Sequence, residues 1–231
     1  MHGSKSDASL TWKSVGRILD WMGFSIGAWG LLLPVPYRLA VLGNMGAFVV
    51  ALAMKVISRQ QLAITDAKAG DSRPRIQGLF VMPALVVALR ALVDINLLDW
   101  QSVLLWALGL AAVLAIPVFA NDRQLSKKLF NVIFLPLVTY AFAWGAIAEA
   151  DFMFDTSPPH VFQTTIRSMH VSHGKSISYH FELASWDGRP AGDSLRVPYA
   201  LYAGHRPGDQ ICVVLHDGWL GFRTFEAQPC W

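Results

Sequence analysis

Five long apolar stretches fill the first two thirds of this 231-residue chain, and they limit what it can fold into. They cover residues 18–33, 39–57, 76–98, 102–120 and 129–148. A helix needs about 20 mostly apolar residues to cross ~30 Å of hydrocarbon. Polar or helix-breaking residues separate the stretches, among them Pro34 and Pro36, which lack the N–H that a continuing helix uses. We therefore expect an α-helical bundle of about five transmembrane helices in a lipid bilayer.

The charged residues divide the chain into two parts. They make up only 15% of it, against about 25% in soluble domains, and the shortage is confined to the apolar stretches. We expect an amino-terminal segment at 1–17, a transmembrane domain at 18–148, a linker at 149–160 and a small domain at 161–231. From residue 149 onward six Lys and Arg face nine Asp and Glu. This slightly acidic balance argues against nucleic-acid binding.

The basic residues that flank the stretches predict an orientation. Cytoplasmic flanks of membrane helices are enriched in Lys and Arg. One set of flanks holds eleven basic residues, whereas the opposite set, at 34–38, 94–101 and 149–160, holds only Arg38. The eleven are Lys5, Lys13, Arg17, Lys55, Arg59, Lys68, Arg73, Arg75, Arg123, Lys127 and Lys128. We expect a multi-pass inner-membrane protein with a cytoplasmic amino terminus and, after an odd number of crossings, a periplasmic carboxyl-terminal domain.

Four polar residues inside the stretches are candidate functional residues, because ionisable groups in hydrocarbon are costly. Arg90 and Asp94 are four apart, so they share a helix face and can pair. We favour a self-paired charge near the outer end of a helix; the alternative is a gate or pathway residue of a small transporter or channel. Asp20 is expected to pair with Arg17, and Asn44 to hydrogen-bond across helices.

Small residues recur every fourth position in three of the stretches, as they do where membrane helices pack closely. We favour packing within one chain, and a homo-oligomer is the alternative. The residues are Gly23 and Gly27; Gly43, Ala47 and Ala51; and Ala107, Ala111 and Ala115.

After Pro158 and Pro159 the pattern changes from helical to alternating. From Ile177 to Ala184 apolar and polar residues alternate, which predicts a half-buried strand. Residues 161–171 form its expected partner, joined by a turn in which Gly174 allows positive φ. Further strands are expected near 195–197, 211–215 and 222–227. Five short antiparallel strands predict a small all-β domain, a barrel of OB-like or SH3-like size or a sandwich.

The two cysteines of the chain, Cys212 and Cys230, both lie in this domain. A periplasmic domain is in an oxidising compartment, so we expect a disulfide between them. A metal site built on the two thiolates is the less favoured alternative.

Six of the seven histidines also lie in the tail. His170, His173 and His180 are weak candidates for metal ligands, because one hairpin register makes His170 and His180 diagonal neighbours. Zinc needs three or four converging ligands, and no metal-binding motif accompanies them. We find no catalytic motif and no phosphate-binding loop, so we expect neither an enzyme nor a cofactor.

These observations favour a membrane-anchored domain that binds another protein of the cell envelope. It could serve as an assembly subunit, or as an immunity-type protein that blocks a membrane-targeted toxin. The aromatic residues of the tail support this interpretation, since aromatic side chains often anchor interfaces. Two alternatives remain open: the transporter or channel that uses Arg90 and Asp94, and a metal or pH sensor that uses the histidines of the tail.

Overall fold

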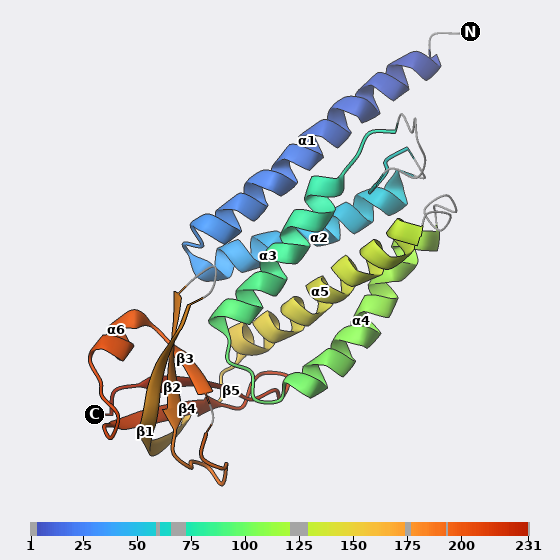
Figure 1. Cartoon of the computed structure of the whole chain (residues 1–231). Coiled ribbons are helices and arrows are strands. Elements are labelled where there is room, and N and C mark those ends of the chain that lie inside the picture. The colour runs from blue at the N-terminus through green and yellow to red at the C-terminus, as the bar shows by residue number, and fades with distance from the viewer. Residues whose placement is uncertain are drawn as a thin grey trace. The chain divides into compact units, whose positions relative to one another are not determined.

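A computed structural model describes residues 4–58, 61–65, 73–120, 129–173, 177–192 and 194–230, with side chains from Trp12 onward. The chain forms two compact units (Figure 1). One consists of Met1–Val93 and Gln101–Glu149, and the other of Asp94–Trp100 and Ala150–Trp231. The first is a bundle of long helices and the second is a five-stranded antiparallel near-barrel. The predicted fold class is therefore confirmed.

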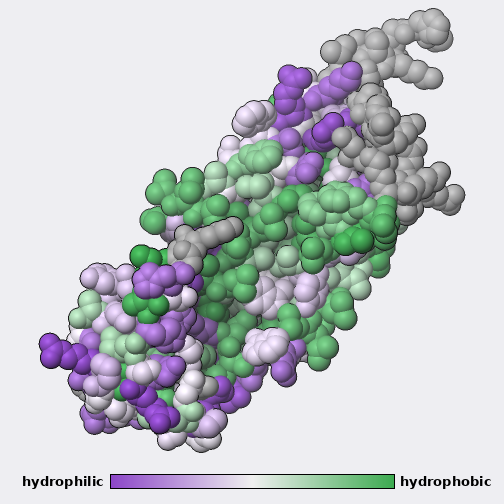
Figure 2. All heavy atoms as spheres, in the orientation of Figure 1, coloured by the Kyte–Doolittle hydropathy of each residue, from purple (hydrophilic) through white to green (hydrophobic). Residues whose placement is uncertain are grey.

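The bundle is built from five long helices: α1 (Ser4–Leu32), α2 (Tyr37–Ile57), α3 (Gln77–Asp94), α4 (Trp100–Ala120) and α5 (Leu129–Phe154). Of these, α2 to α5 are long and apolar enough to cross a membrane, which makes the chain a multi-pass membrane protein. Apolar residues cover much of the helical surface, whereas polar residues are common on the β domain (Figure 2). The helix α1 is less apolar, because its first half, which ends near Arg17, is polar and its second half contains Asp20.

The bundle core is centred on three phenylalanine rings from three helices. Phe48 of α2 stacks on Phe142 of α5 with ring centroids 3.8 Å apart, and it lies 4.8 Å from Phe80 of α3. Residues 62–65, which follow α2, are also buried, and Leu62 and Ile64 join the same cluster. Helices far apart in the sequence therefore share one apolar core.

Several of the predicted helix bounds differ from the observed ones. The helix α1 begins at Ser4 and not at 18, so it takes up most of the expected amino-terminal segment. The stretch predicted at 76–98 ends as a helix at Asp94, because the next residues bond to a strand. Leu98 N donates to Arg223 O at 2.8 Å, and Phe225 N donates to Asn96 O at 3.0 Å. The helix α5 continues past the predicted end at 148 to Phe154, into the segment expected as a linker.

The β domain contains β1 (His160–His173), β2 (Ile177–Leu183), β3 (Ser194–Val197), β4 (Gln210–His216) and β5 (Thr224–Gln228), in the order β3-β2-β1-β4-β5. The long strand β1 pairs with β4 through its first half and with β2 through its second half. The register shifts between Ile166 and Ser168, where a bulge bends the strand. The strand β1 thereby joins β2 and β3 on one side of the near-barrel to β4 and β5 on the other. The expected turn residue Gly174 lies outside the described residues.

The β domain has a small apolar core and one disulfide bond. Phe181, Leu195 and Ile211 are fully buried at its centre. Cys212 of β4 and Cys230, which follows β5, form a disulfide, so the predicted pairing is confirmed. The bond holds the last strand against its neighbour.

Candidate functional site

Asp20 and Arg90 each bind the end of a neighbouring helix. The N–H of Gly78, in the first turn of α3, donates to Asp20 Oδ1. Arg90 donates from Nε to Gly30 O at 2.8 Å and from Nη2 to Leu31 O at 2.6 Å, in the last turn of α1. A carboxylate at a helix amino terminus and a guanidinium at a carboxyl terminus satisfy backbone groups that have no partner within the helix. The two side chains therefore link α1 to α3 at two levels.

The same two helices run side by side in the same direction. Near Asp20, a Cβ placed on Gly23 would collide with the backbone of Leu79. Further along, a Cβ on Gly30 would lie 2.9 Å from Val86 Cγ1. Because the contacts advance together in both helices, α1 follows α3 through most of its length.

For Asp20, the hydrogen-bond partner observed is not the predicted one. Asp20 accepts from α3 rather than pairing locally with Arg17. Arg90 donates hydrogen bonds to carbonyl groups of α1, and its pairing with Asp94, at the exposed last position of α3, stays a prediction. This arrangement favours a structural role for Arg90 over a role in a transport path.

Asn44, the remaining predicted residue, lies fully buried in α2. Its Nδ2 donates to Ala40 O at 2.8 Å within the helix and to Ile26 O of α1 at 3.3 Å. A Cβ on Gly30 would collide with the same amide group. The amide therefore links α1 to α2, and it requires the small residue opposite it.

Sequence reasoning missed three buried charged residues: Lys55, Glu149 and Asp151. Lys55 Nζ donates to Leu62 O at 3.2 Å, and the Tyr37 hydroxyl donates to Glu149 Oε1 at 2.8 Å. Their place at the ends of apolar stretches was the available signal, but it also fits an ordinary flanking charge. Only the packing of the folded chain distinguishes a buried charged residue from an exposed one at such a position.

One face of the β domain carries a polar row formed by His170, His180 and Arg196. The structure sets His170 directly opposite His180, and not diagonally, and His180 directly opposite Arg196. The two imidazole rings stack with centroids 4.9 Å apart. Burial, the neighbouring His170 and Arg196 lower the pKa of His180 below its ordinary value of 6.5.

The histidines do not assemble a metal site in the described part of the chain. His173 ends β1 opposite Ile177, outside the polar row. Among the described residues, no group of three or more His, Cys, Asp or Glu is placed to hold a metal ion. Next to the row, the Ser168 hydroxyl donates to Glu182 Oε2 at 2.6 Å, so this serine is held by a carboxylate.

A second surface of the β domain, which we name the aromatic end, consists of Tyr179, Tyr199 and Tyr202. Tyr179 belongs to β2, and the other two belong to the short helix α6 (Tyr199–Ala203), which sequence reasoning did not predict. The ring of Tyr179 lies 5.1 Å from Tyr199 and 4.9 Å from Tyr202. None of the five residues of α6 is buried, and Tyr199 is 63% exposed. Pro198 before the helix and Gly204 after it were the available signals.

The edge of β5 is held by an ion pair within the second unit. Arg223 Nε lies 3.0 Å from Asp99 Oδ2, and Arg223 Nη2 lies 3.2 Å from Asp99 Oδ1. The hydrogen bond from Arg223 lowers the pKa of Asp99 despite its partial burial. The segment before α4 is therefore fixed to the β domain by charge as well as by backbone bonds.

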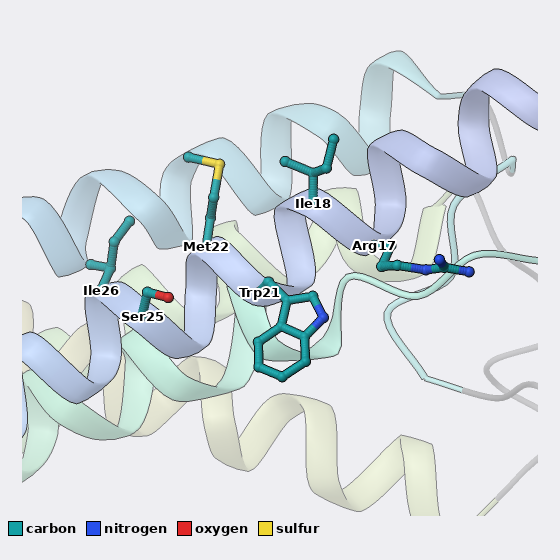
Figure 3. A pocket seen from close by; sticks show the side chains of 6 residues that line it. All are labelled: Arg17, Ile18, Trp21, Met22, Ser25 and Ile26. Atoms are coloured by element: carbon teal, nitrogen blue, oxygen red, sulfur yellow. The ribbon is translucent and has the colours of Figure 1, made fainter.

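The outward side of α1 carries a shallow pocket of about 390 Å³ (Figure 3). All six residues that line it come from this one helix, and most are apolar: Arg17, Ile18, Trp21, Met22, Ser25 and Ile26. Figure 3 shows Arg17 extending away from the apolar side chains.

Comparison with known proteins adds no further constraint: no family model, curated protein or solved structure matches this chain.

Proposed function

We propose that this protein presents its β domain on the outer side of the cytoplasmic membrane, where the domain binds another protein of the cell envelope. The partner is either a component of an envelope assembly or a membrane-targeted toxin that the domain blocks. The observation that carries the proposal is the aromatic end. Its exposed Tyr199 lies on a helix without a buried residue, as expected of a surface that another protein covers.

The topology in this proposal requires α1 to be a fifth crossing. Two observations support this. The helix follows α3 from Asp20 beside Gly78 to Gly30 beside Val86, so it reaches as deep as a helix that crosses. Most of the exposed residues of α1 from Ile18 onward are apolar, with Ser25 as an exception. Five crossings leave the two ends of the chain on opposite sides of the membrane.

Charge and redox chemistry support the direction of the crossing. The flanks rich in Lys and Arg belong on the cytoplasmic side. The disulfide belongs in an oxidising compartment, and it lies in the domain that the charge pattern assigns to the opposite side.

A cysteine introduced at Ser185, an exposed residue of the β domain, tests the topology. In intact cells Ser185→Cys should react with a membrane-impermeant thiol reagent. A matched cysteine at Ser126, between two apolar stretches whose flanking charges assign it to the cytoplasm, should react only after lysis. The reverse result would reject the topology and with it an exterior partner.

Site-specific crosslinking of the full chain tests the partner. Benzoylphenylalanine at Tyr199 keeps an aromatic ring in place, and the same residue at exposed His173 serves as the control. We expect one defined protein, identified by mass spectrometry, to be captured from position 199 and not from position 173. Equal capture at both positions, or no capture at 199, would contradict a role for the aromatic end.

A further inference from the structure

We infer that residues 217–221 of the β domain form a membrane-interface anchor, in which Trp219 and Leu220 insert into the headgroup region of the lipids around the end of α5. The inference depends on α5 being a membrane-spanning helix. It does not depend on the proposed protein partner.

Hydrogen bonds hold the turn at 217–221 against the last turn of α5. Leu220 N donates to Asp151 Oδ1 at 2.6 Å, and Trp219 N donates to Asp151 O at 3.2 Å. Just after the helix, Asp155 Oδ2 accepts from Gly218 N at 3.2 Å. Asp151 is fully buried beneath these contacts. The turn therefore has a fixed position relative to the end of the helix.

Gly218 shows how closely the two segments meet. A Cβ at this residue would collide with the Asp151 carboxylate. The φ of Gly218 is +79°, a backbone conformation that glycine adopts without strain. The lack of a side chain and the positive φ both suit glycine at this position. Gly218 therefore lets the turn lie directly against the end of α5.

The larger side chains of the turn form an exposed apolar surface that continues from the helix. Trp219 is 60% exposed and Leu220 is 46% exposed. The Trp219 ring meets Phe154, the last residue of α5, edge to face with centroids 5.8 Å apart, and Phe154 is 48% exposed. An apolar surface at the end of a membrane-spanning helix lies where hydrocarbon gives way to headgroups.

The composition of the turn favours lipid as the occupant of this surface. Tryptophan is enriched at membrane interfaces, because its ring is apolar and its N–H can reach water or headgroups. Residues 217–221 include no Lys or Arg, so the anchor is hydrophobic and not a binding site for anionic headgroups. The acid at its start, Asp217, lies 3.4 Å from His160 in the domain.

The test uses the full chain in liposomes of zwitterionic lipid, with a nitroxide label on Leu220→Cys or, as the control, on Ser185→Cys. Molecular oxygen partitions into the bilayer, whereas a water-soluble nickel chelate does not. With the chelate on both sides, we expect a label at 220 to collide several-fold more with oxygen than with the chelate. A label at 185 should show the opposite preference.

Equal exposure of the two labels to the chelate would overturn the inference. The inference would also be overturned if the label at 220 were protected from the chelate only in native membranes, because that result indicates that a protein covers the turn. Shielding that requires anionic lipid would also overturn it. Since the liposomes contain no partner protein, these outcomes are independent of the proposed function.

Discussion

At the scale of single residues, polar side chains that are buried or half-buried in the bundle join one helix to another. Asp20 accepts from the start of α3, Arg90 donates to the end of α1, and Asn44 joins α1 to α2. Each meets backbone groups that hydrocarbon cannot satisfy. The sequence predicts that such residues have partners, but it does not identify them, because the partner depends on which helices become neighbours.

Replacing Arg90 by leucine should loosen α1 from α3. The two charge-assisted bonds to Gly30 and Leu31 would be lost, at a cost of about 1–3 kcal/mol. Thermal unfolding in detergent measures the loss. Arg90→Lys should recover part of it, and the exposed Arg38→Leu should have little effect. If Arg90→Leu were as stable as Arg38→Leu, the hydrogen bonds from Arg90 to α1 would contribute nothing measurable to stability.

The polar row of the β domain should make its stability depend on pH. The pKa of His180 is lower in the folded domain than in the unfolded chain, mainly by burial and then by His170 and Arg196. The resulting stability is fully present above pH 6.5 and is lost as the pH falls through the lower, folded value. His180→Gln should flatten the pH dependence of unfolding between neutral and mildly acidic pH. A matched His173→Gln should keep the wild-type slope, and identical slopes for both variants would contradict this origin.

At the scale of elements, small residues decide which helices can approach closely. Gly23 lies against the backbone of α3, and a Cβ on Gly145 of α5 would lie 2.7 Å from the backbone of Ala88. The sequence pattern indicates close packing for Gly23, but it does not identify the partner helix. Gly145 lay outside the predicted stripes.

Two glycine substitutions separate packing from helix propensity. Gly23→Ala should destabilise the protein by about 1–3 kcal/mol, because the added methyl group meets backbone that cannot move aside. Gly46→Ala should be neutral or stabilise by up to about 1 kcal/mol, since a Cβ there meets nothing within 4 Å. Thermal unfolding in detergent compares them. Equal effects would show that the close approach of α1 and α3 is absent in the membrane.

At the scale of the whole molecule, the second unit is assembled from two separate parts of the chain. The residues before α4 extend the sheet beside β5, and Arg223 holds them through Asp99. This pairing covers strand groups that would otherwise form an exposed edge. A fragment that begins after α5 would lack this cover, so functional experiments require the full chain.

Removing the disulfide should weaken the β domain. The bond joins Cys212 and Cys230 across 18 positions, and closing a loop of that size contributes about 3 kcal/mol in the chain-entropy model. We expect the double variant Cys212→Ser and Cys230→Ser to lose this amount in denaturant unfolding. Wild-type protein treated with a reductant should match it. If the reductant also lowered the free energy of unfolding of the double variant, the loss of stability would not come from the disulfide.

Local patterns were enough to predict the membrane helices, the strands and the disulfide. Apolar length determines whether a helix can cross a membrane, alternation determines a half-buried strand, and a lone pair of cysteines in one small domain leaves one pairing. Tertiary structure decided the rest: that residues 96–98 join a sheet, that Asp20 binds α3, and that Asp151 holds the turn containing Trp219. These contacts join residues far apart in the chain, and a pattern within one segment carries no information about the geometry of another.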